Sequence, residues 1–578
     1  MTDYHAPTSA VLDALDAAGL PALLELDAFA HVDRDMVTTL VEEFGRFVDE
    51  VIVPTDAIGD DVGSRHDPAT GEVTTPEGFV KAYRRYVESG WGALAFPEEH
   101  GGGGLPRLVG LALQEMMTSA NVALSLNPVL TQSVIEGLTK LGTPSQQRRF
   151  VPRLLTGEWN GTMVLTEPDA GSDVGAVRTR AEQDDDGTWR LTGTKLFITW
   201  GEHDLTDNIV HLVLARTPDA PVGTKGLSLF LVSKHLVDAE GRLGVRNTVR
   251  CASVEHKVGI HASPTCVLDF DRAEAELVGE VGDGMGLMFV VMNSARLSIG
   301  LQGLAAAEVT SQQALAYAHE RRQGRVATTP KGESARIEDH PDVRRMLLTM
   351  RSATDAVRLV LYTTGAQADL AAHHPDEDVR ARAKDRADLL TPIAKGWSTD
   401  EGVEVASLAI QVHGGVGYVE ETGVARHWRD ARIAPIYEGT NGIQAIDLVM
   451  RKLRLRDGSV IADLLSELEA LDGPLAEAGD ELAEVRARLA DALVAVRAAT
   501  AWLIERAATA PDDALAGATA YLDLLGSTLG GALLAESALR LRSPRSIGIA
   551  TFYATERLAR VPGLLGPVTA GAARLVIA

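Results

Sequence analysis

The segment IYEGTNGIQ, residues 436–444, carries one carboxylate, Glu438, among apolar side chains and glycines. An apolar enclosure raises the pKa of a carboxylate, which moves the group toward the range that a general base needs. Gly439 lets the backbone come close to a ligand. The alternative is an ordinary acid in a surface turn. The segment therefore indicates proton abstraction as one function and plain turn structure as the other.

A second candidate site is MVLTEPDAGSDVGAVRT, residues 163–179. Gly171 lets backbone N–H groups approach a ligand, and Thr166 and Ser172 add hydroxyl groups, which suits carbonyl or phosphate oxygens. A long hairpin loop capped by Asp and Ser side chains is the alternative. The strand KLFITWGE follows at residues 195–202, and its aromatic side chains are core residues by default.

Two further segments could approach an anionic or planar ligand. HERRQGR, residues 319–325, concentrates positive charge in an acidic protein, which suits a pyrophosphate and equally a solvated helix end. QVHGGVGYVEETG, residues 411–423, follows a helical pattern and lacks the spacing of a Rossmann dinucleotide fingerprint. It is compatible with a helix C-terminus at which the backbone meets a ligand.

The elements that must position these residues fall into four regions: 1–160, 161–280, 281–454 and 455–578. The first and third have helical stripes, and the second has short β-branched runs between Gly, Pro and Asp turns. We therefore predict an α+β multidomain fold with an N-terminal helical domain, a middle antiparallel β domain and a C-terminal helical bundle. This order is not the strand–helix alternation of a Rossmann domain.

The last region is predicted to be an additional helical domain. Leu482, Val485, Leu489, Leu493 and Val496 form a helical stripe. New helices are expected to begin at Pro511 and after Ser543. No cluster of His, Cys or paired acids occurs here, so we expect a structural or assembly role.

Composition restricts the function classes. The chain has 578 residues and a net charge of −25, which makes a nucleic acid an improbable partner. Cys251 and Cys266 have no metal-ligand spacing and read as buried thiols of a reducing cytosol. The start shows no basic region followed by an apolar stretch, so we expect no signal peptide. No run reaches the roughly 18 apolar residues of a membrane helix, so we expect no membrane-spanning segment. The expectation is a soluble, cytoplasmic protein.

The motifs VLTEPDAGSD, KLFIT, QVHGGVGY and WRDARIAPIYEGTNGIQ occur in this order between about residue 40 and residue 454. Together they resemble the acyl-CoA dehydrogenase flavoenzymes. The added C-terminal region resembles the larger bacterial subgroup, which includes 3-methylmercaptopropionyl-CoA and broad-range acyl-CoA dehydrogenases. In that subgroup an extra helical domain follows the core.

The resemblance implies that Glu438 removes the pro-R α-proton of an acyl thioester. The N–H of Gly439 would then reach the thioester oxygen as negative charge develops on it. Some family members place the base on the first long helix of the C-terminal domain, immediately before an arginine. Here Ala295 precedes Arg296, so that position offers no acid.

The same resemblance implies an FAD site and an acyl-CoA channel. The implied cofactor-binding residues are Thr166, Gly171, Ser172, Phe197, Ile198, Thr199, Arg321, Gln323, Gln411, Gly414, Gly415, Thr440 and Asn441. The implied substrate-binding residues are Ser172, Asn293, Arg296, Tyr437 and Gly439. Many relatives have Trp at the position of Phe197, and several have Asp at that of Asn293.

The resemblance also carries expectations about reaction and assembly. It implies oxidation to a trans-2-enoyl-CoA, as in fatty acid β-oxidation, with electrons passed to an electron-transfer flavoprotein. An acyl-CoA oxidase that uses O₂ and a non-catalytic flavin or acyl-CoA binding protein are the alternatives. Gln411, Gly414 and Gly415 would reach the FAD of a neighbouring subunit. We expect a homodimer in which residues 455–578 pack on their own protomer.

Overall fold

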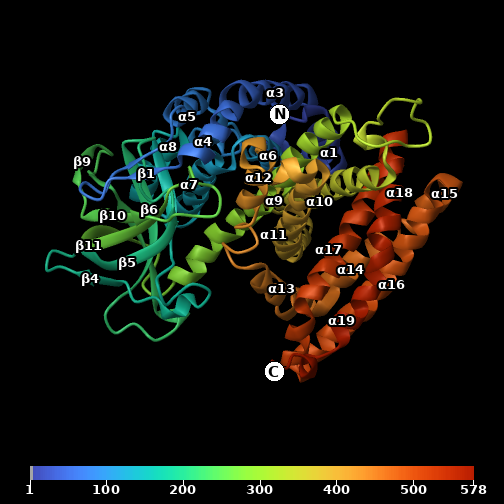
Figure 1. Cartoon of the computed structure of the whole chain (residues 1–578). Helices are drawn as coiled ribbons and strands as arrows, with labels where there is room; N and C mark the ends of the chain where they lie inside the picture. Colours follow the sequence, from blue (N-terminus) through green and yellow to red (C-terminus); the bar gives the residue numbers. More distant parts are fainter. Residues whose placement is uncertain (1–3, 578) are drawn as a thin grey trace. The chain divides into compact units, whose positions relative to one another are not determined.

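The computed structural model describes residues 4–577, apart from the side chains of residues 290, 291, 293 and 294. The chain forms two compact units (Figure 1). The β unit comprises Phe47–Leu105 and Ala120–Ala295. The helical unit comprises Met1–Arg46, Pro106–Ser119 and Arg296–Ala578.

The β unit combines helices with a β-barrel-like sheet. Its helices are α4 (Asp56–Val62), α5 (Phe79–Glu88), α7 (Val122–Leu141) and α8 (Pro144–Leu155). Its strands are β1 (Arg65–His66), β2 (Val73–Thr74), β3 (Trp159–Val164), β4 (Arg180–Gln183), β5 (Trp189–Thr199), β6 (Asn208–Arg216), β7 (Leu227–Ser233), β8 (His235–Val237), β9 (Leu243–Arg246), β10 (Val249–Val254) and β11 (Thr265–Val278).

The main sheet has seven strands in the order β10-β11-β5-β4-β6-β3. Strand β7 pairs with both β11 and β6, which closes a circuit through β5 and β4. The predicted middle β domain is confirmed, and most of its pairs are antiparallel. The exceptions are β3–β6 and β4–β6, which are parallel. The chain between β3 and β6 is long enough for a crossover, which a parallel pair requires and a tight hairpin cannot supply.

The interior of the sheet is apolar and contains both cysteines. Cys251 and Cys266 are buried and free, as expected, and burial raises the pKa of the Cys266 thiol well above its usual range.

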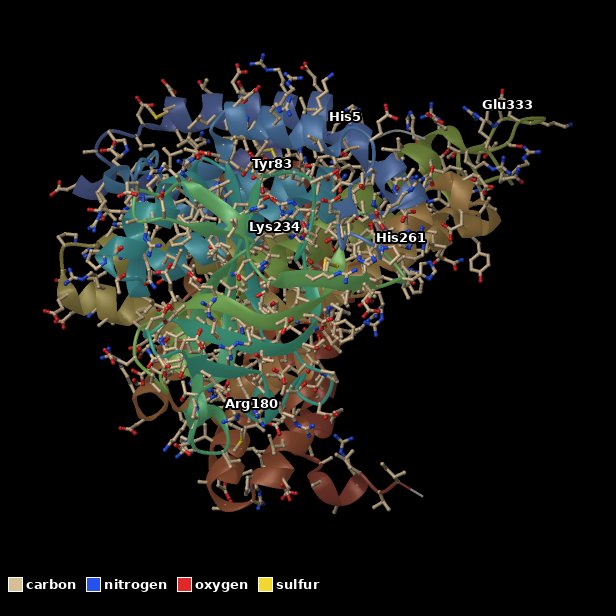
Figure 2. All side chains as sticks on the ribbon, turned by 90° about the vertical axis from the view of Figure 1, so that its left-hand side faces the viewer. His5, Tyr83, Arg180, Lys234, His261 and Glu333 are labelled. Atoms are coloured by element: carbon tan, nitrogen blue, oxygen red, sulfur yellow. The ribbon has the colours of Figure 1, made fainter. Side chains whose placement is uncertain are left out.

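The β unit also contains a buried carboxylate with two cationic partners. Glu202 accepts from Lys234 at 2.5 Å and from Arg246 at 2.9 Å. Figure 2 labels Lys234 over the strands. Pairing of this kind satisfies a charge that burial would otherwise penalise.

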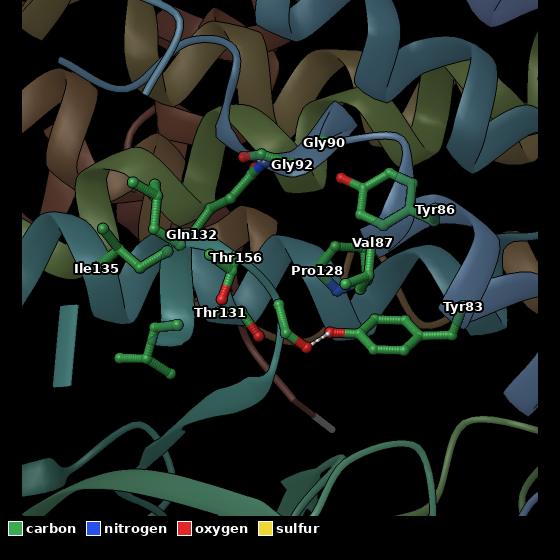
Figure 3. A pocket seen from close by; sticks show the side chains of 13 residues that line it. Tyr83, Tyr86, Val87, Gly90, Gly92, Pro128, Thr131, Gln132, Ile135 and Thr156 are labelled. Atoms are coloured by element: carbon green, nitrogen blue, oxygen red, sulfur yellow. Dashed lines mark hydrogen bonds between the residues drawn. The ribbon is translucent and has the colours of Figure 1, made fainter. Parts of the chain in front are cut away.

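A small cavity lies between α5, α7 and the end of α8 (Figure 3). Its volume is about 30 Å³, and it is lined by side chains that include Tyr83, Tyr86 and Gln132. Tyr83 Oη donates to the carbonyl oxygen of Gly157 across it at 2.9 Å. A volume of this size suits a water molecule, so the cavity is a packing feature of the fold.

The helical unit is built from long helices. Its members are α1 (Thr8–Ala17), α2 (Leu20–Leu23), α3 (Arg34–Phe47), α6 (Arg107–Ala120), α9 (Gly284–Glu320, from Arg296 onward), α10 (Pro341–His373), α11 (Glu377–His413), α12 (Val424–Ala431), α13 (Asn441–Met450), α14 (Ser459–Glu469), α15 (Asp472–Glu477), α16 (Ala483–Thr509), α17 (Pro511–Leu541), α18 (Pro544–Glu556) and α19 (Leu565–Thr569). The fold class predicted from the sequence is confirmed.

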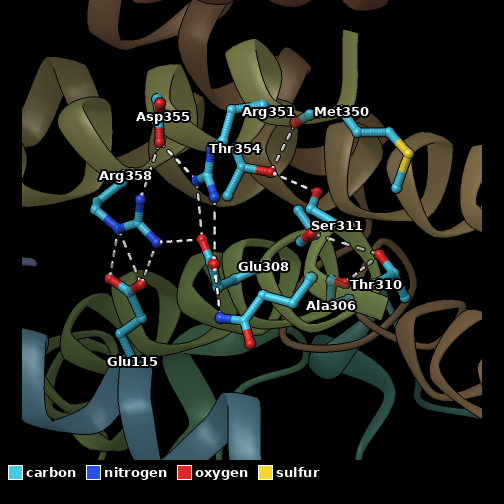
Figure 4. A network of polar contacts seen from close by, with 12 residues as sticks. Glu115, Ala306, Glu308, Thr310, Ser311, Met350, Arg351, Thr354, Asp355 and Arg358 are labelled. Carbon is cyan, nitrogen blue, oxygen red and sulfur yellow. Dashed lines mark hydrogen bonds and ion pairs between the residues drawn. The ribbon is translucent and has the colours of Figure 1, made fainter. Parts of the chain in front are cut away.

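A buried ion cluster joins three of these helices (Figure 4). The guanidinium of Arg358 on α10 donates to Glu115 on α6 and to Glu308 on α9, each at 2.7 Å. Arg351 also donates to Glu308, at 2.8 Å, and Tyr362 donates to Glu115 at 2.6 Å. Every charge in the cluster therefore has an oppositely charged partner, which buried ions require.

The C-terminal tail, residues 455–578, packs on the helices of its own chain. Helix α17 contacts α10, α11 and α13 of the core bundle and α16 and α18 of the tail. The predicted starts of α17 and α18 are confirmed, and Ser543 caps α18. By length and composition alone α17 could cross a membrane, but 78% of its most apolar window is buried inside the protein. Neighbouring helices therefore account for its hydrophobicity.

Candidate active site

The proposed base, Glu438, lies on the connection between α12 and α13. Backbone hydrogen bonds within this connection hold it together. The Ile436 N–H donates to the Ile433 carbonyl at 2.9 Å, and the Asn441 N–H donates to the Pro435 carbonyl at 2.9 Å. Thr440 caps α13 by accepting from the Ile443 N–H at 3.2 Å. We call residues 435–441 the base loop.

Glu438 stands at the most unusual backbone position of this loop. Its φ is 55° and that of Gly439 is 84°, so both residues are left-handed. A non-glycine residue in this region carries backbone strain, and such strain is concentrated at functional sites. The base loop therefore holds Glu438 in a backbone conformation that glutamate rarely adopts in an unfolded chain.

The carboxylate of Glu438 is partly buried and accepts no hydrogen bond from any residue that the structure describes. Burial raises its pKa, although the cations Arg296 and Lys395 act in the opposite direction. A carboxylate that accepts no hydrogen bond from the described residues and has a raised pKa has the properties of a general base. Within residues 4–577 the N–H of Gly439 also has no protein acceptor. It is therefore available to a substrate oxygen.

The residues around Glu438 come from α9, α11 and α13. Arg296 on α9 is 4% exposed, and its Nη1 lies 3.6 Å from Oδ2 of Asp447 on α13. The hydroxyl of Tyr437 donates to Gln302 on α9. Ala295 is buried and carries no acid, and the side chain of Asn293 lies outside the described residues.

Sequence reasoning missed Lys395, which lies under the base loop. This lysine on α11 has no exposed surface, and its Nζ donates to the Gly439 carbonyl at 2.9 Å and to Asn441 Oδ1 at 2.8 Å. Lys395 lies 43 positions before Glu438 in a helical stripe, so no local pattern marked it. The side chain of Asn441 is committed to this network and does not face outward.

In the β unit, Glu167 organises the loop that holds Thr166, Gly171 and Ser172. Its buried carboxylate accepts from the N–H groups of Arg178 and Thr179, at 2.6 and 3.0 Å, and from Lys195 Nζ at 2.9 Å. Burial would raise the pKa of Glu167, but the Lys195 ammonium and these hydrogen bonds lower it. The loop is thus closed on itself, and Gly171 and Ser172 remain exposed.

Strand β5 presents Phe197 beside this loop through a β-bulge. Lys195 and Ile198 of β5 pair with Leu268 and Cys266 of β11, so two β5 residues oppose one β11 residue between them. Phe197 has φ 59° and is 58% exposed, whereas Ile198 is buried. The Leu196 N–H donates to the Thr166 carbonyl at 2.9 Å, which joins strand and loop. A bulge re-aims a side chain, and here it turns an aromatic ring outward.

The remaining predicted cofactor residues lie in exposed segments of the helical unit. Arg321 and Gln323 follow the end of α9, and the Gln323 N–H donates to the Ala335 carbonyl at 3.0 Å. Glu333, in the same excursion, is labelled in Figure 2. Gln411, Gly414 and Gly415 lie at the end of α11 and are exposed. A Cβ built on Gly171, Gly414 or Gly415 would meet no described atom within 4 Å.

The structure thus groups the predicted residues into two sets. The β unit brings Thr166 next to the end of β5, and Gly171 and Ser172 follow it in the exposed part of the same loop. The helical unit places Arg296 and Glu438 within electrostatic reach of each other. Thr199 is partly buried at the last position of β5.

Sequence models of protein families cover most of the chain. Residues 37–158 match the N-terminal domain of acyl-CoA dehydrogenases, residues 162–273 the middle domain and residues 282–453 the C-terminal domain. Residues 463–577 match a domain described as acetyl-CoA dehydrogenase C-terminal like.

Among curated proteins, the chain is 46% identical over 538 residues to 3-methylmercaptopropionyl-CoA dehydrogenase of Ruegeria pomeroyi, covering 93% of this chain and 91% of that protein. It is 36% identical over 545 residues to a broad-specificity linear acyl-CoA dehydrogenase of Mycobacterium tuberculosis, covering 91% and 88%. In fold it is similar to Caenorhabditis elegans ACDH-11 in complex with C11-CoA, with a TM-score of 0.77, 21% identity and coverage of 96% and 93%.

Proposed function

We propose the function from one premise: the chain belongs to the acyl-CoA dehydrogenase family. It is an oxidoreductase of that family, and its cofactor is FAD. The reaction that we propose is the α,β-dehydrogenation of an acyl-CoA thioester to a trans-2-enoyl-CoA. The observation that carries this proposal is the partly buried carboxylate of Glu438, which accepts no hydrogen bond from any described residue.

In this proposal Glu438 takes the α-proton of the thioester. Burial favours the protonated carboxyl group, so the proton that leaves the α-carbon has a suitable acceptor. The N–H of Gly439 faces the thioester oxygen and stabilises the negative charge that develops there. FAD, when bound, supplies the acceptor for the hydride that leaves the β-carbon. Within the helical unit, Arg296, Tyr437 and Gly439 are proposed to bind the acyl-CoA, and Ser172 and Asn293 keep the substrate-binding role that the resemblance implies.

The exposed glycines and the outward-facing aromatic ring fit a large planar cofactor. Open space beside Gly171, Gly414 and Gly415 permits close backbone approach, and the exposed Phe197 offers a surface for a ring system. The residues proposed to hold FAD directly are Thr166, Gly171, Ser172, Phe197, Ile198, Thr199, Arg321 and Gln323. Those proposed to reach the FAD of a neighbouring subunit are Gln411, Gly414 and Gly415. The side chains of Thr440 and Asn441 bond within the base loop network, so we assign them to shaping the site.

We further propose an electron-transfer flavoprotein as electron acceptor, a cytoplasmic location and a homodimer. The four domains proposed are residues 1–160, 161–280, 281–454 and 455–578. The packing of α17 on α10 and α11 supports the homodimer, because the tail covers helical surface that a second dimer could otherwise use. Sedimentation of the full-length protein tests this proposal, and a tetramer would contradict it.

The reaction is tested by titrating purified protein with acyl-CoA esters without oxygen while following flavin absorbance. The series runs from butyryl-CoA to long-chain esters and includes 3-methylthiopropionyl-CoA. Bleaching by at least one ester is expected, and no bleaching by any of them would refute the activity. Turnover with a flavoprotein acceptor, compared with peroxide release in air, separates a dehydrogenase from an oxidase.

A further inference from the structure

Lys395 is a buried cation whose hydrogen bonds end on the base loop. It lies on α11, has no exposed surface, and donates to the Gly439 carbonyl at 2.9 Å and to Asn441 Oδ1 at 2.8 Å. Removing an ammonium group from water is costly unless hydrogen bonds and charges compensate for it. Here the hydrogen bonds come from the residues that follow Glu438, and the compensating charges are those of Asp400 and Glu438.

Asn441 fastens the same loop to α11 through its amide group. Its Nδ2 donates to the Gly396 carbonyl at 2.9 Å and to Asp400 Oδ1 at 2.8 Å. Its Oδ1 accepts from Lys395, so the orientation of the amide is determined. Gln444 Nε2 adds a second donor to the Gly439 carbonyl, at 3.2 Å. The C-terminal side of the base loop is therefore anchored to α11 and to the first turn of α13.

The N-terminal side of the loop has its own anchor. Tyr437 Oη donates to Gln302 on α9. Hydrogen bonds therefore anchor the residue before Glu438 and the residue after it. Glu438 and Gly439 are both left-handed, with φ of 55° and 84°. Without the bond from Lys395, only the longer bond from Gln444 would hold the Gly439 carbonyl, and the restraint on this strained pair would weaken.

The charged groups around Glu438 come from three helices. Arg296 on α9 and Lys395 on α11 are the cations, and both lower the pKa of Glu438 against the effect of burial. Asp400 on α11 acts on Lys395, and Asp447 on α13 acts on Arg296 and pairs with Arg451 at 2.7 Å. Burial lowers the pKa of Lys395 to about 8, so its charge is present at neutral pH.

We propose that Lys395 is a positioning residue for the base: its ammonium holds the Gly439 carbonyl, keeps Glu438 in its left-handed conformation and faces the carboxylate as a cation. This inference rests on the proposed function, because it concerns the same α-proton abstraction. Lys395 itself touches neither substrate nor cofactor in this proposal.

The test measures the rate of flavin reduction by an acyl-CoA that bleaches the wild-type enzyme, from pH 5.5 to pH 8, in FAD-loaded full-length protein. Lys395→Met removes both the hydrogen bond and the charge, Lys395→Gln keeps a donor without the charge, and Lys395→Arg keeps the charge. Lys452→Met is the matched control, since it removes one cation from the same unit outside the base loop.

Lys395→Met is expected to slow flavin reduction by more than tenfold. It should also move the rising limb of the pH profile to higher pH by about one unit, because loss of the Lys395 cation raises the pKa of Glu438. Lys395→Gln is expected to share the shifted limb but retain more of the rate. Lys395→Arg should keep the wild-type limb, and so should Lys452→Met.

Two results would overturn the proposal. The first is a Lys395→Met enzyme with the wild-type rate and limb, and the second is loss of stability with an unchanged limb in both Lys395→Gln and Lys395→Met. If Lys395→Met does not fold, the comparison of Lys395→Gln with Lys395→Arg still decides the matter. Glu438→Gln is measured in parallel. If Glu438→Gln reduces flavin normally, then the proposed function fails, whereas an inactive Glu438→Gln beside a normal Lys395→Met refutes only the role of Lys395.

Discussion

Gly526 of the tail lies directly against Trp397 of the core bundle. A Cβ added at residue 526 would stand 2.4 Å from Cγ of Trp397, closer than real contacts allow. Gly396, the neighbour of Trp397, is pressed in the same way against Leu522 of α17. The tail and the bundle therefore share one close-packed interior within the helical unit, in which small residues permit the contact.

The first prediction is that Gly526→Val destabilises the protein. The added side chain must displace Trp397 or α17, and overpacking of this kind typically costs about 1–3 kcal/mol. Urea unfolding followed by far-UV circular dichroism measures the change. Gly548→Val is the control, because a Cβ at this exposed position on α18 meets no described atom within 4 Å. Equal stability of the two variants would show that the tail is not tightly packed.

The second prediction concerns the base itself. Glu438→Gln keeps the volume of the side chain and removes its basicity, so FAD content and unfolding should stay as in the wild type. Flavin reduction by acyl-CoA should fall by at least about 10²-fold. Glu421→Gln, on an exposed turn in the same unit, should reduce flavin normally. A single-turnover rate within tenfold of the wild type would exclude Glu438 as the base.

The third prediction tests the glycines at the end of α11. Gly415 is exposed, its backbone is not left-handed, and a Cβ there would meet no described atom within 4 Å. Gly415→Val should therefore fold normally and yet retain less FAD, because the branched side chain occupies the space proposed for the cofactor. FAD content per chain after gel filtration is the measurement, with Gly473→Val as the control. Full FAD occupancy in Gly415→Val would remove this residue from the proposed site.

The fourth prediction is that the buried cluster around Arg358 makes stability depend on pH. Burial would raise the pKa of Glu308, but Arg351 and Arg358 hold it well below its usual range. A depressed folded pKa contributes stability that is complete above the unfolded value, about 4.3, and is lost as the pH falls through the range below it. The urea midpoint of the wild type should therefore fall between pH 5 and pH 3, with most of the loss below about pH 4.3.

Glu308→Gln supplies the comparison for this pH dependence. Loss of one partner leaves Arg358 and Arg351 with less compensation, which is expected to cost about 3–5 kcal/mol at pH 7. Because the variant has no carboxylate at residue 308, its urea midpoint should change less between pH 5 and pH 3. An identical slope in both proteins would assign the acid sensitivity to other carboxylates.

The sequence alone determined the features that depend on neighbouring residues. Alternation and turn residues marked the middle β region, and Pro511 and Ser543 marked helix starts that the structure confirms. The apolar setting of Glu438 was also local, since Ile436, Tyr437 and Gly439 adjoin it. Motif order was enough to indicate the family, because each motif is short and its residues are consecutive.

Only the tertiary structure decided the groups that act across long separations in the chain. Lys395 under Gly439, Glu115 with Arg358, and the closure of the Glu167 loop by Lys195 join residues from different elements. The parallel pairing of β3 with β6 and the bulge that exposes Phe197 depend on strand register. Periodicity reports which face of an element is buried, but it does not state which partner covers that face, because packing selects partners by shape and charge in three dimensions.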